Sequence, residues 1–122
     1  MADKLLIILM NTELSQVELV AEAIDQARTA ASMEYKVEVV FTGQAGQLAV
    51  QGHAEKLPLG RAGIRNIYQA IQDASQAGVI FKVCSSALGA GDIELIPEIT
   101  ETVGETYIIS EAMDDETVTF TY

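Results

Sequence analysis

Cys84 is the residue of this sequence best suited to nucleophilic chemistry. It closes an apolar run over residues 79–84 that predicts a buried strand, and a helical turn is expected directly after it. A thiol in that position faces backbone N–H groups without partners and the positive end of a helix, and both favour the reactive thiolate. Ser85 and Ser86 can cap the turn and donate hydrogen bonds to an anionic sulfur. Lys82 shares the strand face of Cys84, where its ammonium group would favour the thiolate further.

Each of these residues also has a simpler interpretation, which the sequence leaves open. Most unpaired cysteines are small buried apolar residues, and spacing alone favours neither interpretation of Cys84. Lys82 by itself is more typical of a lysine that packs its stem and extends its charge into water. His53, the single histidine, is a candidate proton shuttle for the thiol, although a surface loop is its more common setting. We expect no metal site, because one cysteine cannot build a zinc site and no carboxylate cluster can be placed.

Strand patterns alternate with helix patterns along the chain, which predicts an α/β fold with a mostly parallel sheet and helices on both faces. Apolar or β-branched runs predict strands over residues 5–10, 37–41, 79–84, 106–109 and 117–122. Apolar spacings of three or four predict helices over residues 13–32 and 61–76, with shorter ones around 44–51 and 92–97. We expect the rest of 42–60 to be a surface loop and the last strand to lie at a sheet edge. Chemistry in such sheets collects where strands end, so the candidate loops are 11–12, 42–44 and 84–86.

The composition predicts one folded domain over residues 1–122. Apolar residues make up 49% of the chain and charged residues 20%, which is enough apolar material for a core. The 7 basic and 18 acidic residues give a net charge of −11, so we expect neither nucleic acids nor anionic membranes as partners. The apolar run 5–10 is too short for a signal-peptide core or a membrane span, and one free thiol suits a reducing compartment. We therefore expect a cytoplasmic protein.

The segment from Gly78 to Leu88 resembles the DsrE/DsrF-like (YchN-like) family of small sulfur-relay proteins. In that family a helix ends at a glycine, a hydrophobic strand follows, and a cysteine lies at the end of the strand. Gly78 and Cys84 occupy those positions here. The resemblance covers most of the chain, because further parts look like the family's first half and its closing strand: residues 5–32, 37–43 and 115–120.

The resemblance implies a flavodoxin-like three-layer sandwich with about five strands, which assembles into homo-oligomers, as trimers or hexamers. It also implies that the matching cysteine carries sulfur as a persulfide, a role that falls on Cys84 alone. The expected function is a sulfur carrier or sulfurtransferase. Cys84 would take sulfane sulfur from a rhodanese-like or TusA-like persulfide donor protein and pass it to an acceptor thiol. Ser85 and Ser86 would stabilise the persulfide anion, and the chemistry needs no metal or organic cofactor.

Two other functions stay open. Some members of the family lack the cysteine and serve as structural subunits, so the chain is alternatively a non-catalytic interaction subunit with an inert, buried Cys84. A nucleotide or flavin binder at the strand ends is the remaining candidate. The aromatic content of 6% opposes it, and Gly43 and Gly46 come without the lysine and the glycine spacing of phosphate-binding loops.

Overall fold

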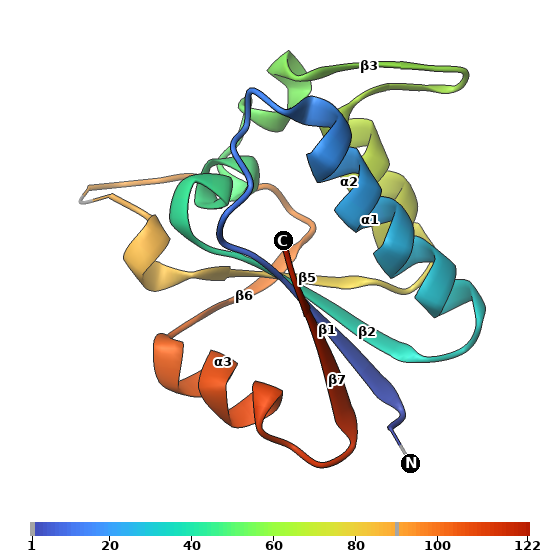
Figure 1. The fold of residues 1–122 in the computed structure, drawn as a ribbon. Helices are drawn as coiled ribbons and strands as arrows, with labels where there is room; N and C mark the ends of the chain where they lie inside the picture. The colour runs from blue at the N-terminus through green and yellow to red at the C-terminus, as the bar shows by residue number, and fades with distance from the viewer. Residues whose placement is uncertain (1, 90) are drawn as a thin grey trace.

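The computed structural model describes residues 2–89 and 91–122, and its centre is a five-stranded parallel sheet (Figure 1). The strand order is β6-β5-β2-β1-β7, and every neighbouring pair runs parallel. The strands are β1 (Lys4–Leu9), β2 (Lys36–Phe41), β5 (Ile80–Cys84), β6 (Ile99–Val103) and β7 (Thr117–Thr121). The α/β class and the edge position of the last strand are both confirmed.

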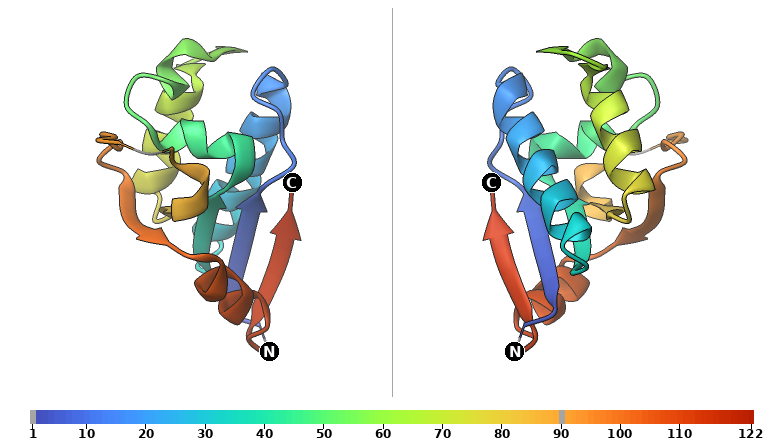
Figure 2. Two further views of the ribbon diagram at one scale, coloured as in Figure 1. Left: turned by 90° about the vertical axis from the view of Figure 1, so that its left-hand side faces the viewer. Right: turned by 90° about the vertical axis from the view of Figure 1, so that its right-hand side faces the viewer.

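Within the described residues, three α-helices cover the two faces of the sheet and complete a three-layer arrangement (Figures 1 and 2). Helices α1 (Val17–Ser32) and α2 (Ile67–Gln76) pack against each other on one face. Helix α3 (Glu105–Ala112) lies on the opposite face and connects the two edge strands, β6 and β7. Asn66 starts α2 by accepting a hydrogen bond from the backbone N–H of Gln69, at 2.9 Å.

The hydrophobic core has a large part and a small part. The large part fills the space between the sheet and the α1–α2 pair, where the rings of Phe41 and Phe81 stack with centroids 5.7 Å apart. The small part lies under α3 and consists of Leu6, Ile8, Val40 and Val103, with Tyr107, Ile108 and Ala112 packed against them. Every residue of α3 is at least partly exposed, so this helix buries less apolar surface on the sheet than α1 and α2, which have fully buried residues.

The sequence predictions after Cys84 are wrong in three places. Residues 106–109 belong to helix α3 and do not form a strand, because the chain must cross from β6 to β7 at the opposite edge and parallel crossovers are usually helical. Residues 92–97 are not helical, and Leu95 instead forms a bridge to Val50. The pattern also missed β6, since an edge strand with exposed polar residues lacks the apolar run of an inner strand.

The stretch between β2 and α2 is more structured than the predicted surface loop. The predicted helix over 61–76 begins only at Ile67, because β3 (Pro58–Arg61) and β4 (Ile64–Asn66) form an antiparallel hairpin before it. The short helix predicted around 44–51 is the 3₁₀ helix η1 (Gly43–Ala49), and a second one, η2 (Ala54–Lys56), follows it. Helix η1 buries Ala45, Leu48 and Ala49, so this segment is part of the core.

Candidate functional site

The carboxyl ends of β1, β2 and β5 meet at one edge of the sheet, where the three candidate loops lie. The backbone N–H of Thr42 donates to the carbonyl of Leu9 at 2.9 Å, which ties the start of the second loop to the end of β1. Gly43 has a φ of 59°, and a Cβ atom there would lie 2.9 Å from the carbonyl oxygen of Met10. Only glycine permits this backbone shape and this close approach, so Gly43 lets η1 start directly beside the end of β1.

Cys84 is the last residue of β5, and its side chain is completely buried. Its Sγ lies 3.1 Å from the Oγ of Ser86, and either atom can be the donor. Residues Ser85–Ala87 form one 3₁₀ turn, η3, which the N–H of Leu88 closes by donating to the carbonyl of Ser85. The turn expected after Cys84 is therefore present, and it places one hydroxyl on the sulfur. Ser85 and Ser86 are both exposed, so a single turn separates the thiol from solvent.

Helix η1 packs against the turn that follows Cys84, and a second segment packs against η1. Helix η1 contacts both β5 and η3. The extended segment near Leu95 pairs with the end of η1, since the N–H of Ile96 donates to the carbonyl of Ala49 at 2.8 Å. These contacts fix η1 from two sides, and η3 rests against it. Because the thiol is buried, a reagent or a partner reaches it only after some part of this packing moves.

The partners of Lys82 among the described residues are two carboxylates and a phenol, and the thiol of Cys84 is not among them. Its Nζ lies 3.0 Å from a carboxylate oxygen of Glu38 and 2.9 Å from one of Glu101, and it donates to the hydroxyl of Tyr107 at 2.7 Å. The ammonium group also lies over the Tyr107 ring, 4.5 Å from its centroid. Burial would lower the pKa of Lys82, but the hydrogen bonds to Tyr107, Glu101 and Glu38 raise it well above its ordinary value. The charge of Lys82 is therefore neutralised by two carboxylates and hydrogen-bonded to Tyr107 of α3.

Glu38 and Tyr107 are residues that the sequence analysis missed, and they form the centre of a buried polar network. Glu38 is only 5% exposed and accepts hydrogen bonds from Lys4, Lys82 and the hydroxyl of Tyr107. Burial would raise the pKa of Glu38, but these hydrogen bonds together lower it. Lys4 also pairs with Glu111 of α3 at 2.7 Å. An acid inside the apolar run of β2 was the available signal, because buried carboxylates almost always have charged partners.

His53 lies exposed immediately before η2, and only its backbone has hydrogen-bond partners in the described part of the chain. The structure therefore places Cys84 and Ser86 in contact, and it shows no contact of His53 or Lys82 with the sulfur among the described residues. Nor do residues 2–89 and 91–122 contain three histidine, cysteine or carboxylate side chains grouped closely enough to hold a metal ion. Within the same residues, none of the helices has the length and apolar character needed to cross a membrane.

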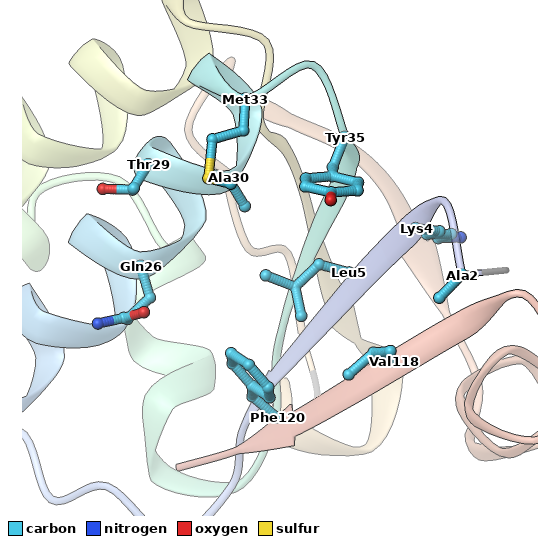
Figure 3. Close-up of a pocket in the computed structure, with 10 residues that line it drawn as sticks. All are labelled: Ala2, Lys4, Leu5, Gln26, Thr29, Ala30, Met33, Tyr35, Val118 and Phe120. Atoms are coloured by element: carbon cyan, nitrogen blue, oxygen red, sulfur yellow. The ribbon is translucent and has the colours of Figure 1, made fainter.

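An apolar groove of about 300 Å³ lies away from the thiol, between α1 and the edge strand β7 (Figure 3). Leu5, Met33, Tyr35 and Phe120 are among the side chains that line it. Phe120 is 40% exposed and Met33 61%, so these side chains leave a hydrophobic surface in contact with water. No part of Cys84 lines this groove.

A comparison with known protein families shows that a model of the DsrE/DsrF-like family matches residues 4–109 of this chain. The chain belongs to the DsrE/DsrF-like family. The resemblance inferred from the segment around Cys84 is thereby confirmed. This family is associated with sulfur relay, the class of chemistry for which a cysteine at a strand end is suited.

Two solved structures share the fold of this DsrE/DsrF-like chain. The YchN protein of E. coli superimposes with a TM-score of 0.72 at 17% sequence identity, over 98% of this chain and 100% of that chain. MTH1491, a protein of unknown function from Methanobacterium thermoautotrophicum, gives 0.68 at 15% identity, over 98% of both chains. At these identities the likeness establishes the fold alone. Among curated proteins, none matches the sequence significantly.

Replacing Glu38 tests the polar network. Glu38→Gln removes the carboxylate that Lys4 and Lys82 share and leaves each with one other carboxylate, so we expect a loss of about 2 kcal/mol of unfolding free energy at pH 7. Because the pKa of Glu38 is lowered in the folded state, its contribution is present above its ordinary value of 4.5 and is lost as pH falls through the folded value. Urea unfolding between pH 7 and pH 3 measures both effects.

The matched control is Glu22→Gln, which removes a carboxylate from the exposed surface of α1. Its unfolding free energy should stay close to the wild-type value. If the stability of Glu38→Gln declined with acid as steeply as that of the wild type below pH 4.5, the network would not have the role described.

Proposed function

We propose that this protein is a sulfur carrier of the sulfurtransferase type, with Cys84 as the residue that holds the sulfur. The observation that carries the proposal is the position of the thiol: the end of β5, with the hydroxyl of Ser86 3.1 Å from the sulfur, in a DsrE/DsrF-like chain. A hydroxyl at that distance can donate to a thiolate or to a persulfide anion, and so it stabilises the loaded and the unloaded forms of Cys84.

The proposed reaction is two successive thiol exchanges at the terminal sulfur of a persulfide. The Cys84 thiolate attacks the terminal sulfur of a donor persulfide, forming a new sulfur–sulfur bond as the donor's own bond breaks and a donor thiolate leaves. An acceptor thiolate then attacks the terminal sulfur on Cys84 and releases the Cys84 thiolate. The sulfane sulfur moves without any net oxidation, so neither step needs a further oxidant or reductant. We propose a rhodanese-like or TusA-like protein as the donor.

The buried state of Cys84 imposes one condition on this reaction. An attack on a donor sulfur requires a line of approach to Sγ, and the closed structure gives none. Turn η3 is the segment whose displacement opens the shortest path, because both of its serines already face solvent. We therefore propose that η3 shifts when a donor docks, far enough to admit the donor sulfur while the hydroxyl of Ser86 stays within reach of Sγ. Local openings of this size are common in loops that bind ligands.

A second candidate function is that of a non-catalytic interaction subunit, and one observation favours it. Complete burial of a lone cysteine is also the usual state of an inert core residue. In that case assembly would be the function, and Cys84 would resist labelling in the native protein. The two candidates therefore differ in the reactivity of one atom.

We also propose that the protein forms homo-oligomers, as trimers or hexamers, and that it works in the cytoplasm. The exposed side chains along the groove between α1 and β7 support assembly, since apolar surfaces of this kind are commonly covered in oligomers (Figure 3). The cytoplasm is supported by the single free thiol, which a reducing compartment keeps available.

Cys84→Ser tests the carrier function directly. We expect the wild type, after incubation with inorganic polysulfide, to gain the mass of a sulfur atom on Cys84 and to lose it on treatment with a reducing agent. The Cys84→Ser variant should fold normally and gain no mass, because serine cannot form a persulfide. Intact-mass spectrometry under native conditions is the measurement. Wild-type protein that gains no mass, with a thiol that reacts only after unfolding, would favour the interaction subunit instead.

Ser86→Ala tests the hydroxyl beside the sulfur. Because a hydrogen bond to an anionic group contributes about 1.5–3 kcal/mol, we expect sulfur loading to become at least about tenfold slower. Ser110→Ala, on the exposed surface of α3, is the matched control and should load at the wild-type rate. The time course of the mass gain gives both rates. Equal loading rates for Ser86→Ala and the wild type would contradict the role of the hydroxyl.

Phe120→Glu tests the groove as an assembly surface. A charge at the centre of an apolar contact is costly to desolvate, so we expect the variant to shift toward a monomer. Light scattering coupled to size exclusion measures the mass of both proteins at micromolar concentration. A wild-type protein that runs at 13.1 kDa would contradict the oligomer itself. An intact oligomer in Phe120→Glu would show that another surface is used.

A further inference from the structure

Gly46 lies at a point of very close contact between η1 and the turn that follows Cys84. It is buried, and a Cβ atom at this position would lie 2.5 Å from the Cβ of Ala87 and 3.1 Å from the Ala87 carbonyl oxygen. Carbon atoms without a bond between them do not approach to 2.5 Å, so no residue other than glycine fits here without moving η3 or η1. Gly46 thus sets the distance at which η3 rests against η1.

Helix η1 is the fixed partner in this contact. At its start, the N–H of Thr42 donates to the end of β1 and the side chain of Gln44 accepts from the loop after β1; at its end, the carbonyl of Ala49 accepts from the N–H of Ile96. The side chains of η1 that face the core are fully buried, whereas in η3 no residue is buried. Added volume at position 46 is therefore relieved mainly by movement of η3, the segment that contains Ser86.

We infer that Gly46 is a positioning residue for Cys84: it lets η3 close onto η1, which keeps the hydroxyl of Ser86 beside Sγ and keeps the thiol covered at rest. This inference rests on the proposed sulfur-carrier function for its meaning. It also gives a steric role to the Gly43 and Gly46 pair, whose spacing alone had no assignment. Gly43 lets η1 begin against β1, and Gly46 lets η3 settle against η1.

Gly46→Ala tests the contact through the reactivity of the native thiol. We expect the rate at which iodoacetamide labels Cys84 to rise about tenfold, which corresponds to about 1.4 kcal/mol less free energy for the opening that exposes it. The rate should depend little on urea at low urea concentration, because a local opening exposes little surface. A variant that was merely less stable would instead label through global unfolding, with a steep dependence on urea.

A compensating change makes the test specific to this contact. Ala87→Gly removes the atom that the new Cβ would strike and leaves the carbonyl contact at 3.1 Å, so the double variant Gly46→Ala, Ala87→Gly should return most of the way to the wild-type labelling rate. Gly60→Ala is the control, because a Cβ there meets nothing within 4 Å and the site lies in the exposed hairpin. Its labelling rate should equal that of the wild type.

Two results would overturn the inference: a folded Gly46→Ala variant that labels at the wild-type rate, or faster labelling that the Ala87→Gly change does not reverse. If Gly46→Ala fails to fold, Ala87→Val crowds the same contact from the exposed turn, and unchanged labelling in that variant would overturn the inference equally. Polysulfide loading of the wild type at high salt, where repulsion of the anion is screened, separates this outcome from the carrier function. A wild type that labels but never loads sulfur contradicts the function and leaves the steric result standing.

Discussion

The carboxylate of Glu38 is the interaction that links more elements of this fold than any other among the described residues. It joins the ammonium groups of Lys4 on β1 and Lys82 on β5, and it accepts from the Tyr107 hydroxyl of α3. Lys82 extends the network to Glu101 on β6. Four neighbouring strands and one helix are therefore tied through one group of charges. Helix α3 buries no residue completely, and this network adds polar contacts to the partly buried side chains that pack it against the sheet. Since α3 is the crossover between the two edge strands, its position also determines how β6 and β7 flank the sheet.

The same network shapes the environment of the candidate thiol. The charge of Lys82 is satisfied by two carboxylates and a phenol, so the group next to Cys84 that acts on the sulfur is a neutral hydroxyl. For a sulfur carrier this is a favourable compromise. A thiolate that is strongly stabilised leaves easily but attacks weakly, whereas a carrier must attack a donor and later leave for an acceptor. A neutral hydroxyl stabilises both the thiolate and the persulfide of Cys84 moderately, so neither form is strongly favoured. Burial under η1 and η3 limits side reactions of the sulfur with oxidants.

Local pattern was sufficient for the inner part of the fold. The apolar runs of β1 and β2 and the helical spacing of α1 identify these elements because their burial leaves a period in the sequence. Cys84 and Ser86 could be placed together because a strand end and a single turn are local features. The sequence pattern failed to predict secondary structure where contacts between distant residues determine it. Residues 106–109 favour a strand locally, yet they form a helix because the two edges of the sheet must be joined.

The missed part of the site has the same physical cause. The bond between Tyr107 and Glu38 joins residues 69 positions apart, and the bond between Lys4 and Glu111 joins residues 107 positions apart. Nothing in the neighbourhood of Tyr107 indicates a buried partner, whereas Glu38 inside an apolar strand requires some cation without specifying which one. The contact of Gly46 with Ala87 is similar, since a pair of glycines in a loop does not reveal the segment that approaches them.

The ion pairs of the basic side chains leave a surface whose charge, as a partner meets it, is mostly negative. Of the 7 Lys and Arg residues, four form ion pairs with other residues in the part of the chain that the structure describes: Lys4, Arg28, Arg61 and Lys82. The few remaining cations face a large excess among the 18 acidic residues, so the surface presented to solvent is strongly anionic. Such a field slows the approach of small anions and speeds that of cations, more so at low salt. Free polysulfide is an anion. Under the proposed function, the charge of this chain therefore favours delivery of sulfur by a protein with a basic contact surface over uptake from solution.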